Sequence, residues 1–306
     1  SECVFSCEID SYAKKQYFAN FGDNPLDDIR EINPSQIPDH DLLFAGFPCQ
    51  PFSIIGNGRG FSDARGTLFF EIVKIIQAKQ PKVFILENVK RLVGHKNGET
   101  LNKILKTLRD LGYWVDYKVL NALDYGLPQK RERVFIVGFS EPKAFFWPTK
   151  TVKRIHLDKI LEKKIDYKYF ASARITKKRK VQHKSKHFPS IWHENKSGNI
   201  SSYPYSCALR AGASHNYLLV NGERRLTPRE MLRLQGFPDS FKIVVPDAQL
   251  RKQAGNAVPV NVVREVLNSL LPFLLEDIPK KKKSKKINSY LKINVKEKVA
   301  TSTHRY

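Results

Sequence analysis

The sequence lacks any hydrophobic run long enough to cross a membrane. A transmembrane helix needs about 20 apolar residues in a row, whereas the longest apolar stretches, such as residues 134–138, have the length of a strand. Residues 1–10 also lack the basic start and apolar core that are typical of a signal peptide. We therefore expect neither a membrane span nor a signal peptide.

Cysteine is scarce, with only four in 306 residues: Cys3, Cys7, Cys49 and Cys207. The first two are spaced as zinc ligands can be, but no second pair accompanies them, so we expect no bound metal. Four scattered cysteines also make no disulfide framework for a chain of this length. Such usage favours the reducing environment of a cytoplasm.

Acidic residues are too few to balance the basic ones. The chain has 53 Lys and Arg against 30 Asp and Glu, a formal net charge of +23. This excess favours a polyanionic partner, with nucleic acid as the first candidate, although a solvated lysine-rich surface would give the same total. Much of the excess lies in residues 280–286, within a tail over residues 279–306 that we expect to be disordered.

The apolar residues that are present form short strand-like runs that alternate with helical patterns. This alternation predicts an α/β fold with a parallel sheet. The expected strands are residues 2–7, 41–45, 83–86, 113–120 and 133–139, and the expected helices are residues 11–21, 67–79, 100–111, 228–234 and 260–275. Between residues 151 and 225 the periodicity fades, which indicates a separate small domain.

Two chemically useful residues follow expected strands. Cys49 comes soon after residues 41–45, and Glu87 directly after residues 83–86. Since ligands bind beyond the carboxyl ends of such strands, both residues should face one crevice. Cys49 also precedes a glycine-rich stretch, residues 56–60, which makes it a candidate nucleophile. Against this, a lone cysteine is often a small buried apolar residue, and Glu87 could be only a helix cap or an ion-pair partner.

A third segment, QKRER at residues 129–133, has the pattern of an extended chain with one charged face. Alternate residues of a strand share a face, so Gln129, Arg131 and Arg133 should point the same way. Two guanidinium groups there would suit a phosphate or a base carbonyl. They could also be ordinary surface charges.

Five motifs, taken together and in this order, resemble those of the bacterial cytosine-5 DNA methyltransferases. They are FPCQPFS at residues 47–53, ENV at 87–89, QKRER at 129–133, RLTPRE with LQGFP at 225–238, and GNAVP at 255–259. The resemblance runs from residue 1 to about residue 275. It implies an S-adenosylmethionine-dependent, Rossmann-like α/β sheet with a smaller target-recognition domain. The implied activity is methyl transfer from S-adenosyl-L-methionine to C5 of a cytosine flipped out of double-stranded DNA.

The resemblance also implies a division of the chain and a biological setting. The expected parts are a catalytic domain at residues 1–150, a target-recognition domain at 151–225, a return to the catalytic domain at 226–278, and the basic tail at 279–306. The expected enzyme is a monomer in the bacterial cytoplasm, associated with the nucleoid and belonging to a restriction–modification system. Residues 193–199 and Arg210 are candidates for reading the target, but the sequence does not reveal the target itself.

The family motifs imply catalytic roles for individual residues. Cys49 would attack C6 of the cytosine as a thiolate. Glu87 would engage N3 and the exocyclic amine with a carboxyl whose pKa is raised by burial. Arg133 would hold the base carbonyl and Arg131 a nearby phosphate, while residues 50–66 would close over the DNA as a lid.

Cofactor-binding residues are implied in the same way. Glu8 matches the acid that binds the ribose hydroxyls, and Ile9 stands where an aromatic residue often lies against adenine. The other residues implied are Asp28 and Ile29, which match the pair that addresses adenine, and Pro48, Leu68 and Asn256, which would line the rest of the site.

One element of the cofactor fold has no counterpart in the sequence. A glycine-rich turn normally lies about twenty residues before the ribose acid, whereas only seven residues precede Glu8. We therefore expect the first strand, the turn and the first helix to lie outside this chain. The chain alone should then be poorly stable and poorly active, and a complementing N-terminal segment is a possible partner.

Three other functions remain open at this stage. A tRNA cytosine methyltransferase of related fold is the nearest, although the basic small domain and the bacterial-type motifs favour DNA. A DNA-binding protein without catalysis is the second: the absent glycine turn favours it, whereas the presence of Cys49, Glu87 and both arginines argues against it. A thiol redox protein is disfavoured because no CxxC accompanies Cys49.

Overall fold

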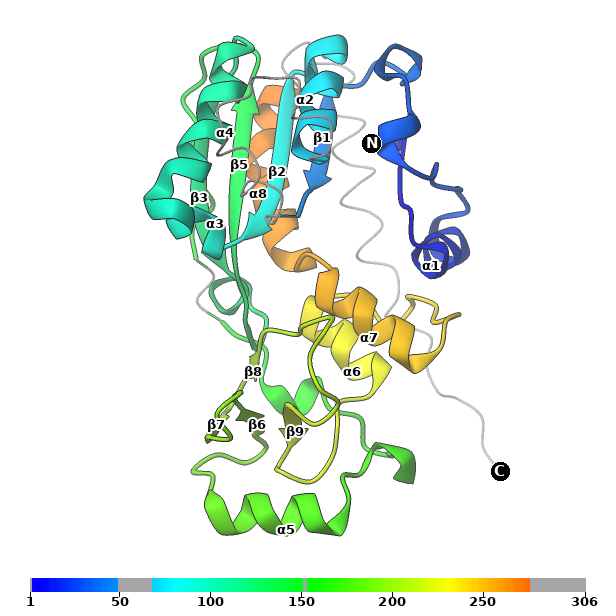
Figure 1. Ribbon diagram of the computed structural model, residues 1–306, viewed down its shortest axis with the longest axis vertical. Helices are drawn as coiled ribbons and strands as arrows, with labels where there is room; N and C mark the ends of the chain where they lie inside the picture. The colour runs from blue at the N-terminus through cyan, green and yellow to red at the C-terminus, as the bar shows by residue number, and fades with distance from the viewer. Residues whose placement is uncertain (1, 49–67, 151–152, 276–306) are drawn as a thin grey trace, which may run out of the picture.

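The computed structural model describes residues 2–48, 68–150 and 153–275, and the structural statements below refer to these residues. They form a larger part, built around a four-stranded sheet, and a smaller part beyond one end of that sheet (Figure 1). Two helices, α6 (Pro228–Gln235) and α7 (Asp247–Asn256), lie between the two parts.

The central sheet has the strand order β1-β2-β5-β3. Strands β1 (Leu42–Gly46) and β2 (Val83–Val89) are parallel, whereas β5 (Glu132–Phe139) runs antiparallel to both β2 and β3 (Trp114–Asn121). The expectation of a parallel sheet is therefore wrong at β5. The physical reason is the short connection between β3 and β5, because parallel neighbours need a crossover of a dozen or more residues.

Helices cover both faces of the sheet (Figure 1). On one face lie α2 (Leu68–Lys79), α3 (Arg91–Gly94) and α4 (Glu99–Asp110), and on the other lies α8 (Val260–Leu274). Strand β2 is buried on both sides. Phe84 and Leu86 pack in the cluster that includes α2 and α4, while Val83 and Ile85 pack in the cluster that includes α8. Burial on both faces explains why an uninterrupted apolar run forms this strand.

The N-terminal segment lies beside the sheet (Figure 1). The strand expected over residues 2–7 is wrong, because Cys7 makes only an isolated bridge to Leu26. Within the part of the chain that the structure describes, no strand lies alongside to complete a ladder. Helix α1 (Ser11–Phe21) follows as expected and is capped by the side chain of Asp10.

The smaller part contains regular elements that the sequence pattern did not reveal. They are a three-stranded sheet of order β7-β6-β9, a parallel pair of β4 with β8, and one helix. Their bounds are β4 (Gln129–Lys130), α5 (Ala173–Gln182), β6 (Ile191–Glu194), β7 (Ile200–Tyr203), β8 (Ser206–Cys207) and β9 (Leu218–Val220). Ile191 and Leu218 share one apolar cluster with Leu234 of α6 and Ala254 of α7, so the smaller part has a common core with these helices.

Six short 3₁₀ helices complete the described chain. They cap strands or turn the chain between longer elements, and the first is capped by Asp28. They are η1 (Ile29–Glu31), η2 (Pro34–Gln36), η5 (His95–Gly98), η6 (Ala122–Tyr125), η7 (Leu157–Lys159) and η8 (Tyr167–Tyr169).

One stretch, Asp247–Leu274, is long and apolar enough to cross a membrane when only its length and composition are considered. It comprises α7 and α8, with Pro259 at the start of α8. Val262 and Val266 of α8 are buried against the central sheet. A helix that packs in a protein core passes the same test, so this stretch is weak evidence for a span.

Candidate active site

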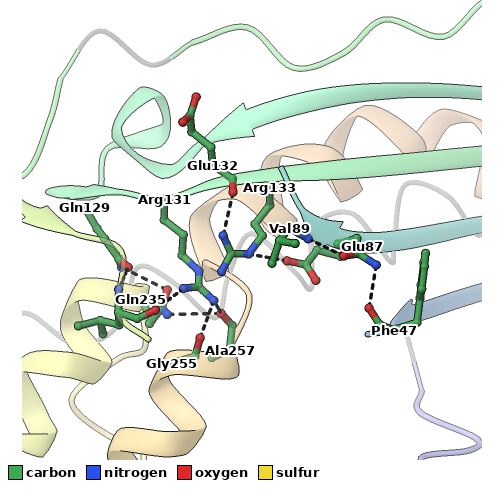
Figure 2. Close-up of polar contacts among 12 residues, drawn as sticks. Phe47, Glu87, Val89, Gln129, Arg131, Glu132, Arg133, Gln235, Gly255 and Ala257 are labelled. Atoms are coloured by element: carbon green, nitrogen blue, oxygen red, sulfur yellow. Dashed lines mark hydrogen bonds and ion pairs between the residues drawn. The ribbon is translucent and has the colours of Figure 1, made fainter. Parts of the chain in front are cut away.

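Strands β1 and β2 end side by side, and a side-chain clamp joins their ends. Gly46 of β1 is the register partner of Glu87 in β2. The amide nitrogen of Asn88 donates to the carbonyl oxygen of Phe47 over 2.8 Å, and the amide oxygen accepts from the backbone N–H of Val89 over 2.8 Å (Figure 2). Phe47, the residue that follows β1, is thereby held next to Glu87.

Glu87 and Arg133 form a largely buried ion pair at these strand ends (Figure 2). Oε1 of Glu87 lies 3.0 Å from Nε of Arg133, and the two side chains are 11% and 15% exposed. Arg133 is the register partner of Val89 in the antiparallel β2–β5 ladder, which brings its side chain to the carboxyl end of β2. Nη1 of Arg133 also donates to the carbonyl oxygen of Glu132 over 2.8 Å. The antiparallel direction of β5 therefore brings the guanidinium group of Arg133 to the carboxyl group of Glu87.

Burial dominates the protonation of this pair. Desolvation raises the pKa of Glu87 above its ordinary 4.5, and the charges of Arg133 and Arg131 offset only part of that effect. Desolvation also lowers the pKa of Arg133. Both groups shift toward their neutral forms despite their contact, because the loss of water outweighs their attraction. Glu87 can therefore keep a proton at a higher pH than an exposed glutamate.

Replacing Arg133 with glutamine should raise the pKa of Glu87 further, because desolvation would then lose its main opposing charge. A ¹³C NMR titration of glutamate-labelled protein measures that pKa. The folded protein binds this proton more tightly than the unfolded chain. The stability gained from it is therefore complete below about 4.5 and is lost as the pH rises through the folded pKa. Arg91→Gln, at an exposed position, is the control, and an unchanged or lower pKa in Arg133→Gln would contradict the assignment.

Arg131 lies in a different setting from Arg133. Its side chain is only 1% exposed. Nη1 donates to the carbonyl oxygen of Leu209 over 2.9 Å, and Nη2 donates to those of Gly255 and Ala257 over 2.9 and 2.7 Å (Figure 2). Burial lowers the pKa of Arg131 to about 9, which leaves it charged at neutral pH. The phosphate contact implied for Arg131 does not fit this geometry, because its terminal nitrogens are already bound to backbone carbonyls inside the protein.

Gln129 has a similar internal role. Its amide nitrogen donates to the carbonyl oxygen of Leu234 over 2.9 Å, and its amide oxygen accepts from the N–H of Leu209 over 3.1 Å. Figure 2 shows Gln129, Arg131 and Arg133 pointing to the same side of the chain, as the alternation in QKRER predicted. Only Arg133 reaches Glu87, whereas the other two join β4 and β5 to α6, α7 and the smaller part.

Replacing Arg131 with glutamine should therefore destabilise the protein rather than weaken one contact to DNA. Three buried carbonyl groups would lose a charged donor, at a cost of roughly 3 kcal/mol or more in the free energy of unfolding. Urea denaturation measures this loss. Arg91→Gln again serves as the control and should change stability by less than about 0.5 kcal/mol. A fully stable Arg131→Gln variant would show that these hydrogen bonds do not hold the two parts together.

Two of the expected cofactor segments lie side by side. The backbone N–H of Glu8 donates to the carbonyl oxygen of Leu26 over 2.8 Å, next to the bridge between Cys7 and Leu26. Two residues further along, Asp28 caps η1 and pairs with Arg30. Hydrogen bonding from Arg30 lowers the pKa of Asp28 to about 2, so this carboxylate is ionised at neutral pH.

Other expected cofactor residues border one apolar cluster. Ile29 and Leu68 pack against the buried cluster that contains Phe47. Pro48 follows Phe47 in the chain and is exposed. Ile9 is also exposed, with 66% of its surface accessible. An apolar surface thus adjoins the segment that carries the ionised Asp28.

Asn256 is the last residue of α7 and is exposed. Lys252, one helical turn earlier on the same face, has its ammonium nitrogen 2.5 Å from Oδ2 of Asp10. The backbone N–H of Asp10 in turn donates to Glu8 over 2.8 Å. The end of α7 is therefore tied to the segment that carries Glu8.

Cys49 and the expected lid over residues 50–66 lie outside the described residues. The basic tail over residues 279–306 lies outside them as well. Phe47 and Pro48, which precede Cys49 in the sequence, are described. In the described ranges, no group of three or more His, Cys, Asp and Glu side chains could hold a metal ion.

Solved structures of low sequence identity show the fold of this protein. A DNMT2 mutant from Spodoptera frugiperda matches with a TM-score of 0.69 at 20% identity, over 88% of this chain and 92% of that chain. The Dnmt2 methyltransferase of S. pombe matches with a TM-score of 0.66 at 22% identity, over 90% of this chain and 91% of that chain. The fold is that of the S-adenosylmethionine-dependent methyltransferases, as predicted.

Sequence relatives show the family. The Type II methyltransferase M.NgoBI of Neisseria gonorrhoeae is 56% identical, over 88% of this chain and 87% of its own length. The Type II methyltransferase M.HaeII of Haemophilus aegyptius is also 56% identical, over 88% and 85%. The family described as C-5 cytosine-specific DNA methylase matches residues 1–271. The chain belongs to the C-5 cytosine-specific DNA methylase family and is a DNA methyltransferase.

Proposed function

We propose that this enzyme transfers a methyl group from S-adenosyl-L-methionine to C5 of a cytosine flipped out of double-stranded DNA. We further propose that it acts as a monomer in the bacterial cytoplasm, as the modification enzyme of a restriction–modification system. The names of the relatives at 56% identity support that setting. The observation that carries the chemical proposal is the buried pair of Glu87 and Arg133, beside the strand end that precedes Cys49 in the sequence.

In the proposed reaction, the thiolate of Cys49 attacks C6 of the cytosine and forms a C–S bond. The electrons of the C5–C6 double bond move into the ring toward N3. Glu87 supplies a proton there and so neutralises the developing charge, while Arg133 holds the base carbonyl. The raised pKa of Glu87 supports this role, because only a carboxyl that retains a proton can donate it.

C5 is nucleophilic once the adduct has formed, and it takes the methyl group. A base then removes the C5 proton, and the electrons of that C–H bond restore the double bond as Cys49 leaves as a thiolate. Glu87 takes back the proton from N3 and the base passes the C5 proton to solvent, so the enzyme returns to its starting state. The positive charges of Arg131 and Arg133 are assigned to favour the thiolate form of Cys49, because the pKa of an unperturbed cysteine thiol is about 8.5.

The methyl donor would supply an electrophilic methyl group on a sulfonium sulfur, which would keep the electrons of the broken S–C bond and leave as a neutral thioether. The described residues fit such a ligand, because an ionised carboxylate at Asp28 adjoins an apolar surface at Ile29 and Leu68. Glu8 is assigned to the ribose hydroxyls, and Asp28 with Ile29 to the adenine. The full set assigned to hold the donor is Glu8, Ile9, Asp28, Ile29, Pro48, Leu68 and Asn256.

Base flipping follows from access, because C6 and N3 cannot be reached inside a duplex. Extrusion of the base costs a few kcal/mol of free energy. We propose that residues 50–66 offset part of this cost by closing over the DNA. Residues 151–225 are assigned to target recognition, with residues 1–150 and 226–278 as the catalytic domain. The position of the smaller part beyond the end of the sheet that carries Glu87 supports this assignment of residues 151–225 (Figure 1), whereas α6 and α7 share the core of the smaller part.

Methyl transfer to duplex DNA and to tRNA, measured side by side with labelled donor, tests the substrate class. The proposal expects transfer to DNA and none to tRNA. Bisulfite sequencing of DNA from cells that express the protein should then show methylated cytosines within one short sequence. Transfer to tRNA alone would support a tRNA methyltransferase instead, and DNA binding without transfer to either substrate would support a DNA-binding protein without catalysis.

A further inference from the structure

A continuous stretch of the smaller part carries only positive charge. Residues 167–193 contain eight Lys and Arg residues, three His and no Asp or Glu. The stretch includes helix α5 and the chain that leads from it to β6. Such a segment has a high positive potential even on a protein that is basic overall.

Two residues fix α5 to the rest of the smaller part. Arg179 is 1% exposed, and its guanidinium lies 2.5 Å from Glu194 at the end of β6. Lys180 pairs with Glu223. These two acids lie outside the basic stretch, so α5 is held in place by charges of the neighbouring chain. Lys168 pairs with Asp247, and the other cations of the stretch are exposed on this fixed helix or on the chain that follows it.

Five of these outward cations make no ion pair with another described residue. They are exposed, and they lie on α5 and on the chain just after it: Arg174, Lys177, Lys178, Lys184 and Lys186. Two of them, Lys184 and Lys186, line an open hollow of about 470 Å³, together with Phe188 and with the ion pair of Lys180 and Glu223. Phe188 is 85% exposed. Unpaired cations around a hollow with an exposed aromatic ring are suited to a phosphate backbone rather than to a small neutral ligand.

The position of α5 separates this surface from the active site. In Figure 1, α5 lies at the end of the smaller part that is farthest from the central sheet, and β6, β7 and β9 lie between. Glu87 and Arg133 form their ion pair at the end of the central sheet that faces the smaller part. A duplex whose target cytosine is at Glu87 would leave the outer face of α5 free for a different segment of polyanion.

We propose that this outer surface, comprising Arg174, Lys177, Lys178, Lys184 and Lys186, binds the backbone of a second duplex DNA segment while the active site holds the first. The partner is duplex DNA because the substrate is a long polymer that always supplies further segments at high local concentration. Contacts to phosphates alone carry no sequence preference and are released by salt. The surface would thus hold the enzyme on DNA and pass it from one segment to another.

A bridging assay tests this inference. A short cognate duplex is fixed to beads and mixed with the full-length enzyme and a labelled duplex that lacks the target site. The test variant changes Lys177, Lys178, Lys184 and Lys186 to glutamine. The control variant removes the same charge elsewhere, by changing the exposed Lys15, Lys96, Lys103 and Lys118 to glutamine.

The proposal expects the wild type and the control variant to retain the labelled duplex on the beads, and the test variant to retain at least tenfold less. The negative slope of log affinity for the second duplex against log salt should become less steep by about 0.9 for each phosphate contact removed. Methylation of the short duplex should be unchanged, because the four lysines are exposed on α5 and the chain after it and are not among residues 193–199 and Arg210, the candidates for reading the target. Equal bridging by the test variant, or an equal loss of affinity for the short cognate duplex itself, would overturn the proposal. Retention of an acidic protein but not of the second duplex would overturn it as well.

Discussion

Replacing Cys49 with serine is expected to abolish methyl transfer and to leave DNA binding largely intact. A serine hydroxyl is not ionised near neutral pH and is a much weaker nucleophile than a thiolate, so the rate should fall on the order of 10⁴-fold or more. Single-turnover transfer of a labelled methyl group to a cognate duplex measures the rate, and a binding titration with the same duplex measures affinity.

Cys207→Ser is the matched control for this experiment. Cys207 lies in β8, and burial raises the pKa of its thiol, which makes it a poor source of thiolate. Transfer by this variant should stay within a few-fold of the wild type. Activity in Cys49→Ser equal to that of the control would end the assignment of Cys49 as the nucleophile.

Replacing Glu87 with glutamine is expected to lower the rate of methyl transfer by about 10² to 10⁴-fold, the usual contribution of a general acid. Glutamine keeps nearly the same shape and can donate a hydrogen bond to N3, but it cannot supply a proton. The loss should therefore appear in the single-turnover rate rather than in the affinity for DNA.

Glu132→Gln provides the control for Glu87→Gln within the same region. Glu132 is on β5 beside Arg133, but its carboxyl pairs with Lys90 at 2.9 Å and is a third exposed. Removing this surface charge should have little effect on the rate. Equal losses in the two variants would show that Glu87 acts only through the general charge of the region.

Much of the larger part could be predicted because its elements depend on local patterns. Residues 83–86 read as a strand since burial on both faces requires an apolar residue at every position. The segment TPRE similarly carries the signal of a helix start: Thr227 and Glu230 form a capping box at α6. Cys49 and Glu87 could be singled out because each follows an expected strand. In the structure β2 continues to Val89, and Glu87 lies near its end, paired with the last residue of β1.

The features that the sequence did not predict depend on contacts between distant segments. The antiparallel direction of β5 is a property of pairing, which hydrophobic periodicity does not encode. The sequence assigned Arg131 to a phosphate contact, with an ordinary surface charge as the alternative. It is instead buried, because the carbonyl groups of Leu209, Gly255 and Ala257 converge on it from two other segments. Helix α7 was missed because its apolar positions are few, with Leu250 and Ala254 among its buried residues.

The most direct test is covalent trapping on a duplex that carries 5-fluorocytosine at the target position. Fluorine at C5 cannot leave as a proton does, so the sulfur that adds to C6 stays bound to the base. With the methyl donor present, the account predicts one enzyme–DNA adduct whose cross-linked peptide contains Cys49, and strongly reduced trapping in Glu87→Gln. An adduct through another residue, or none from an enzyme that still methylates normal DNA, would contradict it.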